Sequence, residues 1–157
     1  MNQSAVTRES FAARWLRRAL IIPAYFLLWG ATVVLLPVLV AVALTVDLTR
    51  RNRGAVTRCI LFLTYYLCCE VVGIAVSFVA WVLWSPALGG RRDAFIDRNF
   101  RLEWWWARTL LAGAKRIFAM RIEAENAEVA KTGPFLLFIR HASVGDTLLP
   151  AELISST

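Results

Sequence analysis

One histidine and one aspartate near the C-terminal end of the chain have the types and the spacing that acid–base chemistry needs. His141 is the single histidine of the 157 residues, and Asp146 follows it five positions later. His141 comes directly after a continuous apolar run at 135–139, which is typical of a strand buried on both faces. Asp146 stands where a helix at 147–154 is predicted to begin. A tight turn between strand and helix would bring the carboxylate back to the imidazole.

This pair suits acyl transfer to an alcohol. A neutral histidine can take the hydroxyl proton as the oxygen attacks the acyl carbonyl. An ionised aspartate fixes the histidine tautomer and stabilises the imidazolium that forms, as in serine hydrolases, with the substrate hydroxyl replacing the serine. The same spacing also fits a histidine beside a helix-capping aspartate that has no catalytic role. The spacing alone leaves both interpretations open.

The stretch GPFLLFIRHASVGD, at 133–146, resembles the first motif of the glycerophospholipid acyltransferase family, which includes the 1-acylglycerol-3-phosphate acyltransferases. The family signature is a histidine, four residues and an aspartate, often with a serine two positions after the histidine. His141, Ser143 and Asp146 match it, whereas Arg140 stands where the family usually has asparagine. Two apolar N-terminal segments before this motif are also usual in the family.

The resemblance implies that His141 is the general base and that Asp146 orients it. It also implies an acyl thioester of coenzyme A or acyl carrier protein as donor and a lysophospholipid such as 1-acylglycerol 3-phosphate as acceptor, with no cofactor and no metal. Ser143 and Arg140 are weaker candidates for substrate binding. The later family motifs, including an Arg-bearing phosphate site, would lie beyond Thr157, so we expect an incomplete domain that is inactive alone. A lipid A-type acyltransferase shares the pattern of a histidine, four residues and an acid, and is the alternative enzyme.

The composition is that of a membrane protein. Hydrophobic residues make up 59% of the chain and the mean hydropathy is +0.57, whereas a soluble domain is nearer half apolar. Residues 19–46 carry no charge, and 59–84 carry one; about 20 apolar residues cross a bilayer core. The first run is too long for a signal peptide. A non-enzymatic membrane anchor or assembly module has the same composition and is the rival from another class of protein.

The chain divides into four predicted regions. These are a basic N-terminal segment at 1–18, a two-segment membrane anchor at 19–86, an amphipathic connecting helix at 91–119, and the start of an α/β acyltransferase domain at 120–157. The predicted fold class is therefore a membrane α-helical hairpin followed by an amphipathic helix and a truncated α/β domain. A short polar loop at 47–58 separates the two apolar segments, and a strand is predicted at 121–125.

The net charge of +7 comes mostly from arginines that cluster beside the apolar segments. Juxtamembrane basic clusters contact phospholipid headgroups, and no pattern of a nucleic-acid-binding surface is present in the sequence. Two spans place both ends of the chain on one side. The flanks carry at least as many basic residues as the loop, which favours the inner membrane with both termini cytoplasmic. A re-entrant or interface-lying hairpin is the alternative.

The predicted helix at 93–119 has an apolar arc and a charged far side. Ile96, Phe100, Leu111 and Phe118 fall within the arc, and Glu103 violates the pattern on that face. Three consecutive tryptophans, 104–106, lie at one edge of the arc. Such a helix either docks on its own domain or lies at a membrane interface with the tryptophans at headgroup level.

Glu70 is the one charged residue of the second apolar segment, and a charge at mid-membrane costs about 2.5–3.5 kcal/mol. It is explained by a neutral side chain hydrogen-bonded between helices, by a segment that does not span, or by a role in lipid or proton handling. Cys59, Cys68 and Cys69 lie in the same segment and are interpreted as small packing residues, with palmitoylation of a juxtamembrane cysteine as the alternative.

Overall fold

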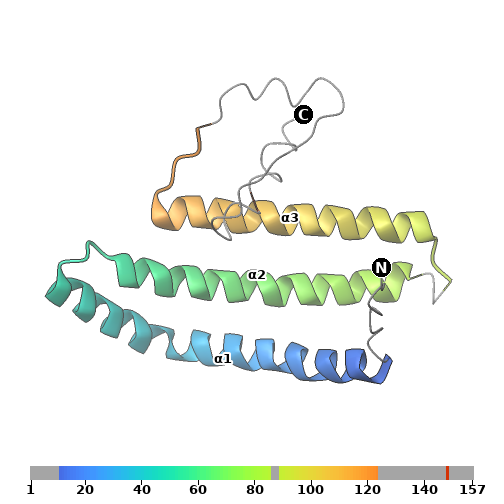
Figure 1. Ribbon diagram of the computed structural model, residues 1–157, viewed down its shortest axis with the longest axis horizontal. Coiled ribbons are helices and arrows are strands. Elements are labelled where there is room, and N and C mark those ends of the chain that lie inside the picture. Colours follow the sequence, from blue (N-terminus) through green and yellow to red (C-terminus); the bar gives the residue numbers. More distant parts are fainter. Residues whose placement is uncertain (1–10, 86–88, 124–147, 149–157) are drawn as a thin grey trace, which may run out of the picture.

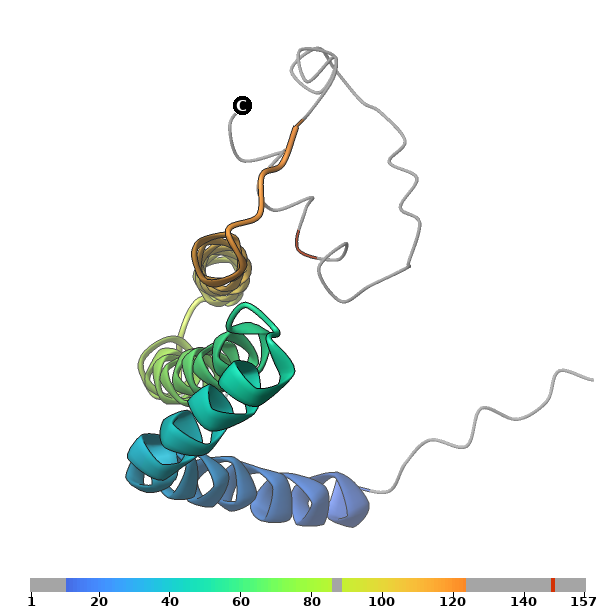
Figure 2. The ribbon, with the colours of Figure 1, turned by 90° about the vertical axis from the view of Figure 1, so that its left-hand side faces the viewer.

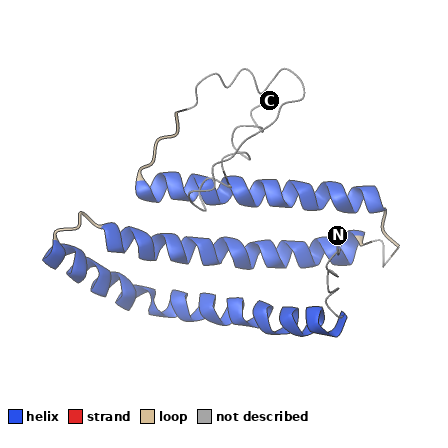
Figure 3. Cartoon of the chain, viewed as in Figure 1, coloured by secondary structure: helices blue, strands red, loops and turns tan. Residues whose placement is uncertain are grey.

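The computed structural model describes residues 11–85, 89–123 and 148, and these form three long helices. Helix α1 spans Phe11–Arg50, α2 spans Ala55–Trp84 and α3 spans Arg92–Phe118. The helices run antiparallel to their neighbours in one row, with α2 between α1 and α3 (Figures 1 and 3). Two of them, Trp15–Arg50 within α1 and the whole of α2, are long and apolar enough to cross a membrane. The helical part of the predicted fold class is thus confirmed, and the helices support membrane association.

Helix α1 continues through two prolines but does not run straight. Pro23 and Pro37 both lie inside it, and each proline removes one helical hydrogen bond and crowds the preceding turn. Figure 2 shows the blue N-terminal part of α1 running away from α2 before the cyan part rises to the connecting loop. Its 40 residues amount to about 60 Å of helix, twice the thickness of a hydrocarbon core. A straight crossing of the core would therefore leave part of α1 outside it.

The connection between α1 and α2 is shorter than the predicted loop at 47–58. It consists of residues 51–54, and Arg51, at φ 54°, ends α1 in the left-handed conformation. The amide of Asn52 donates to the carbonyl oxygen of Asp47 at 3.1 Å, which is the hydrogen bond of a Schellman motif. Polar residues were expected to mark loop here, but Asp47 and Thr57 belong to the helices.

Asp47 joins the two helices through its side chain. Its carboxylate accepts hydrogen bonds from the amides of Val56 and Thr57, at 3.0 and 2.9 Å, and from the Thr57 hydroxyl at 2.7 Å. The first amides of a helix have no partner within the helix and attract negative charge. A residue of α1 therefore caps α2 and closes the hairpin tightly.

Helix α3 matches the predicted connecting helix within about one residue at each end. Met120 donates to the Lys115 carbonyl at 3.0 Å beyond the left-handed Ala119, which again is a Schellman ending. The predicted strand at 121–125 is not present at 121–123, which form no helix or strand. Residues 124 and 125 lie outside the described residues, as does most of the predicted α/β region.

The face of α3 that contacts α2 differs from the predicted apolar arc. Phe118 and Leu111 are in contact with the protein as expected, since Phe118 packs on Phe62 and Leu111 is buried. However, Ile96 is 55% and Phe100 is 67% exposed, although both lie within the arc. Contacts between α2 and α3 run along both helices and come from Phe62 with Phe118, Tyr65 with Thr109, Gly73 with Trp106, and Trp84 with Arg98.

Candidate functional site

The predicted catalytic pair lies outside the described residues. His141 and Asp146, with the weaker candidates Ser143 and Arg140, fall in the segment 124–147, so their interpretation stays a prediction. The three described helices instead form a different candidate site, a cavity between them.

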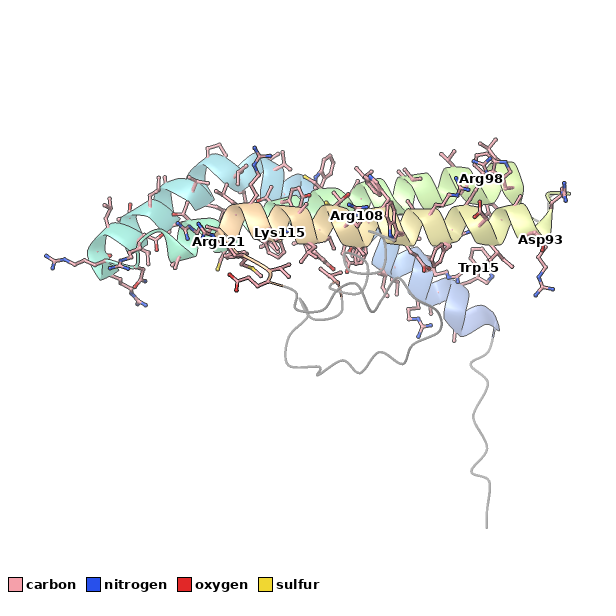
Figure 4. All side chains as sticks on the ribbon, turned by 90° about the horizontal axis from the view of Figure 1, so that it is seen from above. Trp15, Asp93, Arg98, Arg108, Lys115 and Arg121 are labelled. Atoms are coloured by element: carbon pink, nitrogen blue, oxygen red, sulfur yellow. The ribbon has the colours of Figure 1, made fainter. Side chains whose placement is uncertain are left out.

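A cavity of about 1050 Å³ lies among the three helices. The first turns of α1, the C-terminal half of α2 and the N-terminal half of α3 line it. Figure 4 shows this end of the bundle, where Trp15 of α1 is at the same end as Asp93 and Arg98 of α3. The walls are largely apolar, and a ligand site typically combines such walls with a few polar groups.

The polar groups of the cavity come from all three helices. They include Arg18 of α1, Glu70 of α2, and Asn99 and Glu103 of α3. The guanidinium carbon of Arg18 lies 5.8 Å from the centre of the Trp15 ring, a cation–π contact. The cavity therefore offers one cation and two carboxylates inside an apolar groove.

Two of these polar groups have partners within the protein. The side-chain amide of Asn99 donates to the Phe95 carbonyl at 2.7 Å, one turn earlier in α3. Glu70 interacts with the hydroxyl group of Tyr66, which also interacts with Tyr25 of α1. The contact of Glu70 itself lies within α2, and Tyr66 links it to α1, which lowers the cost of its position in an apolar helix.

Tyr65 of α2 makes a close contact with α3. Its hydroxyl donates to the backbone carbonyl of Thr109 at 2.6 Å. Its ring lies over Gly113, where a Cβ atom would overlap the ring carbons. Only glycine permits this approach, so the residue at 113 sets how closely the two helices pack.

A second, smaller feature lies on the outer side of α3. The guanidinium carbon of Arg108 is 4.6 Å from the centre of the Trp104 ring, and Trp105 is exposed beside them. Arg98, Arg108, Lys115 and Arg121 are spread along the length of α3 and its end in Figure 4. Tryptophan and arginine together are the side chains that contact lipid headgroups. This supports the interfacial interpretation of the helix.

Two of the three cysteines, Cys68 and Cys69, have the packing role that was expected. Cys69 is buried and Cys68 accepts a hydrogen bond from the Trp29 indole at 3.3 Å, which links α2 to α1, whereas Cys59 is exposed. Across residues 11–85 and 89–123, no group of three histidine, cysteine or acidic side chains could hold a metal ion.

Comparison of the chain with protein-family models, with curated proteins and with solved structures gives no match.

Sequence reasoning treated Glu70 and Glu103 as two separate exceptions to helical patterns. In the structure both line one cavity, together with Arg18. Two acids that violate two apolar patterns were the available signal, but a single-helix pattern does not place residues of different helices together.

Proposed function

We propose that this chain is part of an O-acyltransferase of phospholipid biosynthesis. The reaction moves a fatty acyl group from a coenzyme A or acyl carrier protein thioester to the hydroxyl of a lysophospholipid such as 1-acylglycerol 3-phosphate. The observation that carries the proposal is the stretch at 133–146, with His141 and Asp146 at the family spacing.

In this mechanism the chain's own groups handle the proton. His141 takes the proton of the acceptor hydroxyl as its oxygen attacks the thioester carbonyl, and then gives a proton to the leaving thiolate. Asp146 holds the imidazole in the tautomer that can accept that proton and stabilises the positive charge that forms. The thioester is a substrate, so the proposed reaction needs no cofactor.

The described helices support this proposal because an enzyme that acts on a lipid must associate with a membrane. Its acceptor is a lipid, so the catalytic residues must be held at a membrane. The apolar helices α1 and α2 supply membrane association, and α3 leads from them towards the segment that carries His141. The proposed location is the inner membrane, with both ends of the chain on the cytoplasmic side.

The test uses the full product of the reading frame that encodes this chain, purified into lipid nanodiscs. Acyl transfer to radiolabelled 1-acylglycerol 3-phosphate is measured with acyl-coenzyme A and with acyl carrier protein thioester. We expect His141→Ala to lower the rate by about 10²–10⁴-fold, the usual contribution of general acid–base catalysis. Asp146→Asn should be severely impaired, because an amide cannot enforce the tautomer, and Ser143→Ala should lose much less.

Unchanged transfer in His141→Ala would refute the mechanism. No transfer by the wild-type protein with either donor, while it remains in the membrane, would favour the non-enzymatic anchor. Transfer only to a glucosamine-based lipid acceptor would favour the lipid A-type enzyme.

A further inference from the structure

Two acidic side chains and one arginine face the same apolar cavity. Glu70 interrupts the apolar α2, Glu103 stands on the predicted apolar side of α3, and Arg18 comes from the start of α1. Charges among apolar helices are costly unless something pairs with them. A cavity with these groups and apolar walls suits an occupant that has both a hydrocarbon part and a polar part.

The cavity is elongated, and its charged groups are distributed along it. On α2 its lining runs from Glu70 to Trp81, a distance of about 16 Å along a helix. The indole of Trp29 bonds to Cys68, and α1 runs antiparallel to α2. Arg18, eleven residues earlier in α1, therefore lies towards the Trp81 end of the cavity, and Glu70 lies at the other end.

The walls between these ends fit a single hydrocarbon chain. Ile22 and Phe26 of α1 line one side, and Ile74 and Phe78 of α2 line another. A cavity of about 1050 Å³ is slightly larger than the usual range for ligand sites, which runs from about 300 to 1,000 Å³. Burying apolar surface there is favourable by about 25 cal/mol per Å².

The end with Arg18 suits an anionic headgroup. A guanidinium group binds phosphate through several N–H donors, and the Trp15 ring 5.8 Å away restrains it. Trp15 and Trp81 both line this cavity, and tryptophan prefers the boundary between hydrocarbon and headgroup. Arg18 is the one basic residue among the described residues of the cavity lining.

The α3 side of the cavity suits free hydroxyl groups. Asn99 and Glu103 are one helical turn apart and both line the cavity. A carboxylate accepts hydrogen bonds from hydroxyl groups but repels a second anion. A lysophospholipid has a free glycerol hydroxyl, whereas a diacyl phospholipid has none on the acylated carbons.

We propose that this groove binds a lysophospholipid, with its acyl chain along the α1–α2 walls, its phosphate at Arg18 and its glycerol hydroxyl at Glu103. That the groove holds the acceptor for acyl transfer rests on the proposed function, whereas the binding itself does not.

Binding is measured with the 157-residue chain in phosphatidylcholine nanodiscs. The probe is 1-acylglycerol 3-phosphate with a brominated acyl chain, which quenches nearby tryptophans, and Trp15, Trp81 and Trp106 line the cavity. We expect a saturable component of quenching, despite the excess of phosphatidylcholine. Ala75→Phe, which places a ring in the cavity where the acyl chain would lie, should abolish that component. Ala31→Phe makes the same change at an exposed position of α1 outside the cavity and should keep it.

The phosphate contact is tested separately. Arg18→Gln should weaken saturable binding at least tenfold, and Arg17→Gln, whose residue does not line the cavity, should match the wild type. A brominated monoacylglycerol, which lacks the phosphate, should bind the wild type and Arg18→Gln equally. This comparison separates loss of the phosphate contact from loss of folding.

The proposal is overturned if quenching never saturates, if Ala75→Phe and Ala31→Phe behave alike, or if Arg18→Gln binds as Arg17→Gln does. Failure of the proposed function is a different result. Saturable, Arg18-dependent binding with no acyl transfer by the full reading-frame product would keep the groove and reject the enzyme. Transfer that is unaffected by Ala75→Phe in that product, together with unsaturable quenching, would keep the enzyme and reject the groove.

Discussion

Helices α2 and α3 have similar lengths and lie side by side, but their surfaces are opposite in character. Helix α2 has 30 residues, of which Arg58 and Glu70 are charged. Helix α3 has 27 residues and nine charges, spread from Arg92 to Arg116. Contacts from Phe62–Phe118 to Trp84–Arg98 keep the two helices together over most of their lengths. Two neighbouring helices that are so different cannot both be suited to the same depth in a bilayer.

This difference bears on how the docked helices lie in a membrane. If α2 crossed the bilayer with α3 docked on it, Arg101 and Arg108 would be carried into the hydrocarbon core. Each would cost about 2.5–3.5 kcal/mol. The docked pair therefore favours an orientation along the membrane surface, with the outer side of α3 at headgroup level. Hydropathy shows that α2 is long and apolar enough to cross, but its neighbour decides whether it does.

The largest expected effect concerns the side of the membrane on which the connection between α2 and α3 lies. A crossing α2 would place this connection on the side opposite to the α1–α2 connection, whereas an α2 that lies along the surface would leave both on one side. Single cysteines replace Arg53, Arg91 or Arg121, all exposed, in a chain whose native cysteines are changed to serine. A membrane-impermeant maleimide is then added outside sealed vesicles. If α2 lies along the surface, all three positions should label from the same side, because no segment between them crosses.

A crossing α2 gives the opposite pattern. Arg53→Cys and Arg91→Cys would then label from different sides, one of them only after the vesicles are permeabilised. If Arg121→Cys then labelled together with Arg91→Cys, α3 would have separated from α2 in the membrane, and the hairpin with two spans would be restored. In both arrangements the two ends of the chain are able to lie on one side.

A smaller effect should follow from closing the space at Gly113. In Gly113→Ala the new methyl group overlaps the Tyr65 ring, so the ring must move and its hydrogen bond to Thr109 is lost. Overpacking costs about 1–3 kcal/mol, partly offset by about 1 kcal/mol from the better helix propensity of alanine. We expect a net destabilisation of up to about 2 kcal/mol, measured by titration with sodium dodecyl sulfate in mixed micelles and followed by tryptophan fluorescence.

Two other glycines are matched controls for this change. A Cβ at Gly73 would lie 3.4 Å from the Trp106 ring, and a Cβ at Gly30 would meet nothing within 4 Å. Gly73→Ala should therefore be close to neutral, and Gly30→Ala should stabilise the protein by up to about 1 kcal/mol. Equal effects at all three positions would show that Tyr65 does not pack on α3 as described.

Much of the helical architecture was predictable from the sequence. The absence of charge over 19–46 and the near absence over 59–84 predicted two long apolar helices, and both are present. The segregated charges over 93–119 predicted α3. These signals are local, because helix length and hydrophobicity depend on neighbouring residues in the sequence.

The packing between helices was not predictable in the same way. Polar Asp47 and Thr57 were expected in a loop, but a carboxylate that caps the next helix looks identical in sequence to a loop residue. The contact face of α3 was assigned by hydrophobicity, whereas Gly113 lets Tyr65 approach and contributes no hydrophobic signal. That Glu70 and Glu103 line one cavity likewise depends on the register between helices. The prediction for His141 and Asp146 lies outside the described residues and stays untested.

The smallest expected effect comes from the one hydrogen bond that Tyr65 donates across the α2–α3 contact. Tyr65→Phe keeps the ring over Gly113 and removes the donor to the Thr109 carbonyl, at 2.6 Å in the structure. A hydrogen bond of this kind contributes about 0.5–1.5 kcal/mol, so the same detergent titration should show a destabilisation in that range. Thr64→Val is the control, because the Thr64 hydroxyl bonds only to the Ile60 carbonyl of its own helix. If Tyr65→Phe and Thr64→Val were equally stable, the bond between the helices would not contribute to docking. If Tyr65→Phe were as damaging as Gly113→Ala, the hydrogen bond rather than the close packing would hold α3 against α2.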